Sequence, residues 1–277
     1  MIKKNPQKPK KIKPKRPVSK VLHSVRQVLK ISHIAEDEAV WQWGEASLEA
    51  LPARFDLGVW NIWKGSGGEG FLCEYKRIIK DRHLLLFQEA LLTLKGLGSF
   101  VPSGYAAHHG ATYRRKDGLR EGVMTVSSAR TKDPAQRILC LIPEPLLKTT
   151  KATLVTMYKI DGQKNALCVV NTHATLFRSP GAAARELEQV IDQIAGHEGP
   201  ILYAGDFNTF SKVYIEAVDR VLSSIGLKRV VLEGDPRSAI TALDQVYVRG
   251  IVIKDARIDT TFTHSDHFPI MASVEIA

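Results

Sequence analysis

The sequence predicts an α/β protein in which two mixed β-sheets pack face to face and helices cover the outside. Short apolar runs that favour strands alternate along the chain with a few stretches of helical periodicity. Strand candidates outnumber helix candidates, a balance typical of packed sheets with outer helices. No Gly/Ser/Pro-rich linker interrupts the middle of the chain, so we expect the 277 residues to hold one large domain.

The individual elements follow from these patterns in chain order. Eight short apolar runs are predicted as strands: residues 56–63, 84–87, 123–127, 152–160, 166–171, 201–204, 243–248 and 268–275. Three stretches with apolar residues at helical spacing are predicted as helices: residues 71–80, 181–195 and 212–225. Polar residues that could carry chemistry fall where predicted strands end, and loops there can aim them into one cleft.

The positive charge is confined to the N-terminal segment. The formal net charge is +10, yet residues 1–34 hold nine Lys and two Arg with no acid, and the remaining 243 hold 28 basic and 29 acidic residues (28 − 29 = −1). We expect a disordered Lys/Pro-rich arm over 1–17, an amphipathic helix and connector over 18–50, and a catalytic domain over 51–277. The arm either attracts a polyanion such as nucleic acid without specificity or only keeps the protein soluble.

Residues 18–29 place Val and Leu at helical spacing among basic side chains. Such a helix could lie on an anionic membrane surface or dock on the protein's own core. Cys73, Cys140 and Cys168 are an odd number of cysteines without metal-ligand spacing, which favours reduced, buried thiols and a cytoplasmic compartment. No apolar stretch approaches the roughly 18 residues of a membrane span. We therefore expect a soluble protein that could bind peripherally to a membrane or a nucleic acid, and no protein partner can be inferred.

Two polar motifs near strand ends suggest a metal-assisted site that cleaves phosphodiesters. Asp206 and Asn208 close the apolar run that starts at Ile201, and Asp266 and His267 lie close to the end of the sequence. Side chains two residues apart on a strand point the same way, so Asp206 and Asn208 can grip one ion, water or phosphate. Asp266 adds an oxygen ligand, and His267 adds a group that can move protons near neutral pH.

Four further polar residues lie at the edges of apolar runs, and each has a structural alternative. Asn61 either satisfies neighbouring backbone or faces a ligand, and Glu89 needs a cation such as Mg²⁺ or stabilises a helix N-terminus. His173 could polarise a phosphoryl oxygen or protonate a leaving oxygen, or it is merely hydrogen-bonded. Asp244 could orient an imidazole, with His267 as the nearest candidate, or it caps a turn.

The ordered set of these motifs is far rarer than any one of them. Asn, Gln-Glu, Asn-x-His, Gly-Asp-Phe-Asn, Leu-Asp-x-x-x-Val and Ser-Asp-His each stand at the edge of an apolar run. The set resembles the endonuclease/exonuclease/phosphatase superfamily. Within it, residues 59–62, 127–129, 192–195 and 243–250 are similar to bacterial YafD-like proteins. The resemblance spans about residues 55–276 and implies a four-layer α/β/β/α sandwich.

The resemblance also implies roles at matching positions. Glu89 would bind Mg²⁺, or Mn²⁺ in its place, with Asn61 and Asp266 beside it. The implied catalytic residues are His173, Asp206, Asn208, Asp244 and His267. Among these, Asp206 and Asn208 would position the attacking water and the scissile phosphate. His267, oriented by Asp244, would be a general base or a phosphate contact, and His173 would be a second histidine whose acidic partner the sequence does not identify. Arg178 is a candidate phosphate contact, with solvated surface charge as the alternative.

Three hypotheses for function follow. The first is a Mg²⁺-dependent phosphodiesterase that acts on DNA or RNA by in-line attack of water, with the basic arm raising the local substrate concentration. The second is a lipid or inositol-phosphate phosphoesterase that the N-terminal 34 residues hold on an anionic membrane. The third is a binding module without catalytic activity on the same scaffold.

Overall fold

The computed structural model describes residues 31–277 apart from 145–148, 177–178 and 237–241. The predicted basic arm, the predicted amphipathic helix with its apolar residues at 18–29, and Arg178 therefore lie outside the described residues. Among the residues that are described, no helix has the length and apolar character needed to cross a membrane.

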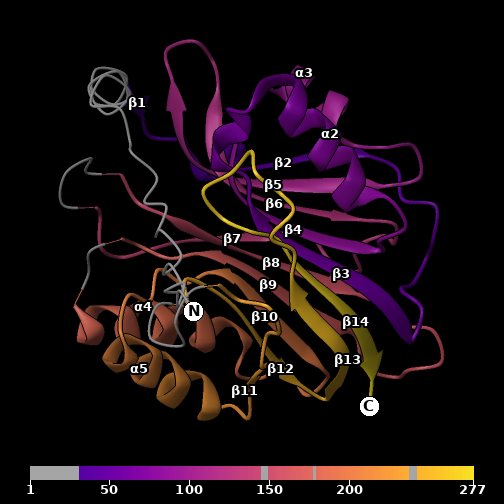
Figure 1. Ribbon diagram of the computed structural model, residues 1–277, viewed down its shortest axis with the longest axis vertical. Helices are drawn as coiled ribbons and strands as arrows, with labels where there is room; N and C mark the ends of the chain where they lie inside the picture. The colour runs from indigo at the N-terminus through magenta and orange to yellow at the C-terminus, as the bar shows by residue number, and fades with distance from the viewer. Residues whose placement is uncertain (1–30, 145–148, 177–178, 237–241) are drawn as a thin grey trace, which may run out of the picture.

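Two mixed β-sheets form the middle of the molecule (Figure 1). The larger sheet has eight strands in the order β1-β5-β6-β4-β3-β14-β13, with β2 also paired to β5. Its strands are β1 (Ile31–Ser32), β2 (Val40–Gly44), β3 (Arg54–Asn61), β4 (Leu84–Leu92), β5 (Ala106–Arg115), β6 (Arg120–Ser127), β13 (Ile251–Ile258) and β14 (Ile270–Ile276).

The smaller sheet has six strands in the order β11-β12-β10-β9-β8-β7. They are β7 (Gln136–Leu139), β8 (Ala152–Tyr158), β9 (Leu167–His173), β10 (Ile201–Asp206), β11 (Lys228–Arg229) and β12 (Asp244–Arg249). Both sheets are mixed because β3 pairs parallel with β4 and β9 pairs parallel with β10, whereas their other pairings are antiparallel.

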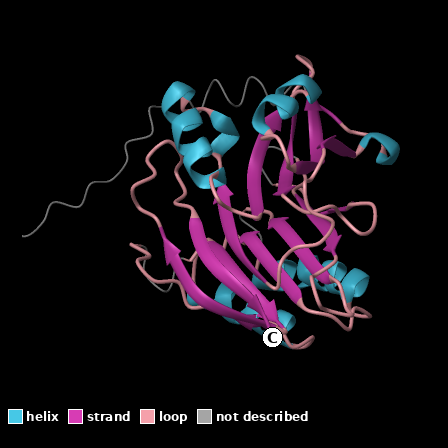
Figure 2. Ribbon diagram, turned by 90° about the vertical axis from the view of Figure 1, so that its right-hand side faces the viewer, coloured by secondary structure: helices cyan, strands magenta, loops and turns pink. Residues whose placement is uncertain are grey.

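Helices cover the outer faces of both sheets, which gives the predicted four-layer α/β/β/α sandwich (Figures 1 and 2). The longer helices are α2 (Gly68–Ile79) and α3 (Leu94–Phe100) over the larger sheet and α4 (Pro180–Ile194) and α5 (Lys212–Ser223) over the smaller one. Two short 3₁₀ turns are η1 (Glu36–Glu38) and η2 (Trp63–Gly65). Helix α4 begins where its sequence predicts, because Ser179 caps the amide of Ala182 and Pro180 occupies the first turn.

Three apolar layers hold the sandwich together. The central layer lies between the sheets and is formed by the inward side chains of strands such as β3, β4, β9 and β10. A second layer packs α2 against the larger sheet, and a third packs α4 and α5 against the smaller one. Apolar residues of α2 recur at positions 71, 75, 78 and 79, which is the spacing of one helix face.

All eight predicted strands and all three predicted helices are present, with ends shifted by a few residues. The sequence patterns missed α3 and the strands β1, β2, β5, β7, β11 and β13. Of the three cysteines, Cys140 and Cys168 are buried as expected, but Cys73 is exposed on α2.

Candidate active site

Sheet register brings three of the predicted catalytic residues into one row. Asp206 at the end of β10 pairs with His173 at the end of β9 and with Asp244 at the start of β12. Neighbours in register place their side chains on the same face of a sheet. All three residues are buried, although they are separated by 33 and 38 positions in the sequence (206 − 173 and 244 − 206).

Gly205 allows this row to close. Its φ of 140° lies in a region that side chains rarely adopt, and a Cβ built on it would lie 2.0 Å from the carbonyl oxygen of Thr172. Any larger residue would push β10 away from β9. The glycine of the Gly-Asp-Phe-Asn motif is therefore needed for strand packing directly beneath Asp206.

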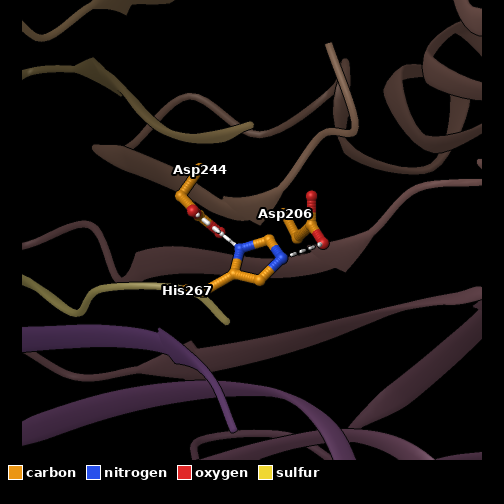
Figure 3. A group of neighbouring side chains, drawn as sticks. All are labelled: Asp206, Asp244 and His267. Atoms are coloured by element: carbon orange, nitrogen blue, oxygen red, sulfur yellow. Dashed lines mark hydrogen bonds and ion pairs between the residues drawn. The ribbon is translucent and has the colours of Figure 1, made fainter. Parts of the chain in front are cut away.

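Asp244 orients the imidazole of His267, as the sequence predicts (Figure 3). Nδ1 of His267 lies 3.0 Å from Oδ1 and 2.9 Å from Oδ2 of Asp244, and Nε2 lies 3.8 Å from Oδ2 of Asp206. Burial alone would lower the pKa of His267, but Asp244 and then Asp206 outweigh it and raise this pKa to about 10. The ring thus carries both protons at neutral pH.

The acidic partner of His173, which the sequence does not identify, is Asp206. Nε2 of His173 lies 3.5 Å from Oδ2 of Asp206. Burial and the nearby ammonium of Lys151 lower the pKa of His173 well below its usual value, so this imidazole is neutral. Burial raises the pKa of Asp206 to about 6. Of the two histidines that flank Asp206, His267 is therefore positively charged and His173 is neutral.

The spacing argument for Asp206 and Asn208 is wrong in its premise. Strand β10 ends at Asp206, and Asn208 has a φ of 51°, so the two residues do not share one strand face. A turn brings them together instead, because the amide of Asn208 donates to Oδ1 of Asp206 at 2.9 Å. The side-chain amide of Asn208 donates to the carbonyl of Ala174 at 2.8 Å, which ties the turn to the end of β9.

Asn61 joins the two sheets at the site. Its Nδ2 donates to Oδ2 of Asp206 at 3.0 Å, and its Oδ1 accepts from the amide of Trp63 at 3.1 Å. Ser265 donates to the Asn61 carbonyl at 2.7 Å, and the same hydroxyl accepts from the amide of His267 at 3.2 Å. Both roles predicted for Asn61 are therefore present, since its side chain satisfies the backbone amide of Trp63 and also contacts Asp206 in the site.

Glu89 has the properties of a carboxylate that binds a cation. It lies beside Gln88, the register partner of Asn61, and has a φ of 52° at a point where β4 slips in its pairing with β6. Burial would raise the pKa of Glu89, but Lys64 and Lys151 outweigh it and hold this pKa far below its usual value. Oε2 is buried and accepts no hydrogen bond from the described residues, although Nζ of Lys64 lies 3.0 Å away. A hard divalent ion suits this oxygen.

A second group of possible ligands, Asp206, Asp244 and His267, has ligand atoms within 4.8 Å of one another. Nδ1 of His267 is hydrogen-bonded to Asp244, and Nε2 faces Asp206 at an ion-pair distance of 3.8 Å. Because a carboxylate holds the imidazole in place from each side, we interpret this group as a proton-handling relay. Asp266 is exposed in the loop before β14, and its place beside Glu89 stays a prediction.

Sequence reasoning missed a buried charged cluster next to Glu89. Lys151 lies 3.4 Å from Glu121 and 3.7 Å from Glu144, and all three side chains are at least nine-tenths buried. Lys64 extends this cluster to Glu89. The one local signal for Lys64 is a basic residue only three positions after Asn61, and nothing local marks Lys151.

Comparison with known proteins gives relatives of both sequence and fold. The model of the Endonuclease/Exonuclease/phosphatase family matches residues 58–267. A UPF0294 protein of Yersinia pseudotuberculosis is 35% identical over 221 residues, which cover 78% of this chain and 82% of the relative. An endonuclease/exonuclease/phosphatase family protein from Leptotrichia buccalis superposes with a TM-score of 0.62 at 16% identity, covering 80% of this chain and 100% of that one. The human Nocturnin catalytic domain with a bound sulfate anion gives 0.61 at 18% identity, covering 82% and 96%.

Proposed function

The chain belongs to the Endonuclease/Exonuclease/phosphatase family, and from this premise we propose that it is a Mg²⁺-dependent phosphodiester hydrolase that acts on nucleic acid. The observation that carries the proposal is the convergence of three nitrogen atoms on one oxygen. Oδ2 of Asp206 lies 3.0 Å from Nδ2 of Asn61, 3.5 Å from Nε2 of His173 and 3.8 Å from Nε2 of His267. A phosphoryl oxygen placed near Asp206 would meet the same donors.

The side chains then divide the work. Asp206 accepts the proton of the attacking water as the water oxygen bonds to phosphorus, the bond from phosphorus to the leaving oxygen breaks, and that oxygen takes a proton from solvent. Asn208 and Asn61 hold the carboxylate of Asp206 in place. His267, fixed by Asp244, donates from Nε2 to a phosphoryl oxygen as charge builds up in the transition state. A Mg²⁺ ion held by Glu89, with Asn61 and Asp266 beside it, would neutralise charge on the phosphoryl group.

The test is a Mg²⁺-dependent activity panel of plasmid DNA, single-stranded RNA, sphingomyelin and inositol phosphates. Asp206→Asn and His267→Ala should each lower turnover by at least about a hundredfold, the usual range for loss of a proton-transfer group. The matched controls are Asp192→Asn and His33→Ala, both at exposed positions. Full turnover in purified His267→Ala protein would refute the mechanism. Cleavage confined to sphingomyelin or inositol phosphates would transfer the proposal to a lipid or inositol-phosphate phosphoesterase.

The basic arm supports nucleic acid as the substrate class. Outside residues 1–34 the chain is close to neutral, so long-range attraction for a polyanion rests on those 11 basic residues. Deletion of residues 1–30 leaves β1 and the buried Ile34 in place. We expect this deletion to raise KM for DNA or RNA strongly at low salt and weakly at high salt. Equal KM values for both proteins would remove the arm from the proposal.

A further inference from the structure

Two residues with unusual backbone conformations meet at the candidate metal ligand. Glu89 has a φ of 52° and Lys64 a φ of 61°, a left-handed region that residues other than glycine seldom occupy. Their side chains form an ion pair, with Nζ of Lys64 3.0 Å from Oε2 of Glu89. Such conformations persist where the surroundings enforce them and are frequent at functional sites.

The turn that carries Lys64 is fastened to the site on both sides. The amide of Trp63 donates to Oδ1 of Asn61 at 3.1 Å, and the amide of Gly65 donates to the carbonyl of Ile62 at 2.8 Å. The amide of Ile62 in turn donates to the carbonyl of Gln88 at 3.0 Å, one residue before Glu89. These hydrogen bonds therefore fix the main chain of Lys64 relative to Glu89, and the side chain of Lys64 can still move.

The charges around this pair favour a further cation over a further anion. Two ammonium groups, Lys64 and Lys151, face three carboxylates, Glu89, Glu121 and Glu144, so the cluster has a net charge of 2 − 3 = −1. Thr149 donates to Glu144, and Tyr113 donates to Glu121, but neither adds positive charge. A substrate phosphate would enter a negative region here, whereas a divalent ion would correct the imbalance.

The two lysines differ in freedom to move. The side chain of Lys64 is 40% exposed, and that of Lys151 is 9% exposed and lies between two carboxylates. Lys64 can leave Glu89 for solvent when a divalent ion takes its place, because the ammonium is then hydrated and the buried carboxylate is still compensated. Lys151 cannot leave in this way, because its departure would leave the buried carboxylates of Glu121 and Glu144 without a counter-ion.

We propose that Lys64 is a built-in counter-ion of Glu89 that a divalent metal ion displaces, so that ammonium and metal compete for Oε2. The proposal rests on the assignment of Glu89 as a metal ligand in the proposed function. The ammonium keeps the buried carboxylate ionised and aimed, and it lowers the apparent affinity for the metal. Lys64 is thus a positioning residue that acts through Glu89.

The test is metal binding to the full chain, measured without substrate. Mn²⁺ is titrated by electron paramagnetic resonance, and Mg²⁺ by calorimetry, into wild type, Lys64→Gln and Lys64→Asn. Asn tolerates a left-handed backbone well, so the second variant guards against misfolding of the first. Lys76→Gln is the matched control, because it removes the same charge from an exposed position of α2. Glu89→Gln tests the ligand itself.

Both Lys64 variants should bind Mn²⁺ about fivefold more tightly, which corresponds to about 1 kcal/mol for loss of a partly exposed competitor. The rise in Tm caused by saturating Mn²⁺ should grow in both, and Lys76→Gln should match wild type. Unchanged affinity in the Lys64 variants would overturn the competition, as would weaker binding, which would make Lys64 a support for the metal. If wild type and Glu89→Gln bind Mn²⁺ equally, the assignment of Glu89 as a metal ligand fails together with this inference. If Glu89→Gln weakens Mn²⁺ binding and the Lys64 variants leave it unchanged, only the inference fails.

Discussion

Replacement of Asp244 by Asn tests the relay that holds His267 charged. Asn keeps the size of the side chain and removes the negative charge that lies 2.9 Å from Nδ1 of His267. Because Asp244 is the main contact that raises the pKa of His267 to about 10, the variant should return this pKa to the neutral range or below. Asp206 remains in place at 3.8 Å from Nε2 and supplies only the weaker part of the effect.

The magnitude follows from two independent estimates. A shift from 6.5 to about 10 is 3.5 units, or about 5 kcal/mol at 1.36 kcal/mol per unit. Opposite unit charges about 3 Å apart attract by about 5.5 kcal/mol at an effective dielectric constant of about 20. Allowing for the hydrogen bond that Asn can still accept, we expect Asp244→Asn to lower the free energy of unfolding at pH 6.5 by about 3 kcal/mol.

The loss must depend on pH in a defined direction. The folded-state pKa of His267 lies above its unfolded value, so its contribution is complete below about pH 6.5 and disappears as the pH rises to about 10. Wild type should therefore lose stability over this window, by up to about 1.4 kcal/mol per pH unit from this group. Asp244→Asn should lack that loss, and the gap between the two proteins should close towards pH 10.

Urea unfolding in EDTA between pH 6.5 and 9.5 measures the gap, with Asp192→Asn as the matched control at an exposed position. Nuclear magnetic resonance titration of the ring, assigned with His267→Gln, measures the pKa directly. A gap that stays constant across the pH range would refute the reasoning, and so would a wild-type His267 that titrates near 6.5.

Three further predictions concern the surrounding structure. Burial lowers the pKa of both His108 and His109 to about 4, so the folded protein favours their neutral forms and should lose stability as the pH falls from about 6.5 to 4. His109→Gln should reduce this loss of stability in urea unfolding between pH 4.5 and 6.5. An unchanged pH profile of stability would contradict the prediction. Lys151→Met leaves two buried carboxylates without a counter-ion and should lower the free energy of unfolding by about 3 kcal/mol. A variant as stable as wild type would disprove that the Lys151 ammonium compensates these carboxylates. Glu74 accepts hydrogen bonds from the backbone amides of Thr263 and His264 at 2.8 and 3.1 Å and so anchors the loop before His267. Glu74→Gln should lower kcat about tenfold with little change in KM. A loss of stability without this change in kcat would show that the role of Glu74 is only structural.

The sequence predicts the fold well because its central strands are buried on both faces. Runs such as residues 84–87 and 201–204 are apolar throughout, and they become β4 and β10, whose side chains alternate between the central layer and the layer beneath the helices. The segment of β5 reads Ala-Ala-His-His-Gly and gives no such signal. It becomes a strand because β6 pairs with it along one edge and β2 along the other, which is a tertiary effect.

The candidate site divides in the same way. His173, Asp206 and Asp244 stand at strand ends, and sheet register alone brings these three residues together, whereas His267 reaches them from the loop before β14. The position of Asn208 was reached by a strand argument that does not apply, because the chain turns after Asp206. Lys151 could not be foreseen, since its partners come from β6 and from the segment before β8, and only the packing of the two sheets buries them together.

Asn61 links Asp206 to the turn that carries Lys64 through two hydrogen bonds. Its amide group has one orientation that satisfies both contacts, because Nδ2 must donate to Asp206 and Oδ1 must accept from Trp63. The first contact holds the residue that would accept a proton, and the second holds the turn that presents Lys64 to Glu89. Substitution of Asn61 would therefore release both the carboxylate of Asp206 and the turn that carries Lys64. One amide group thus fixes the position of the proton acceptor relative to the turn beside Glu89.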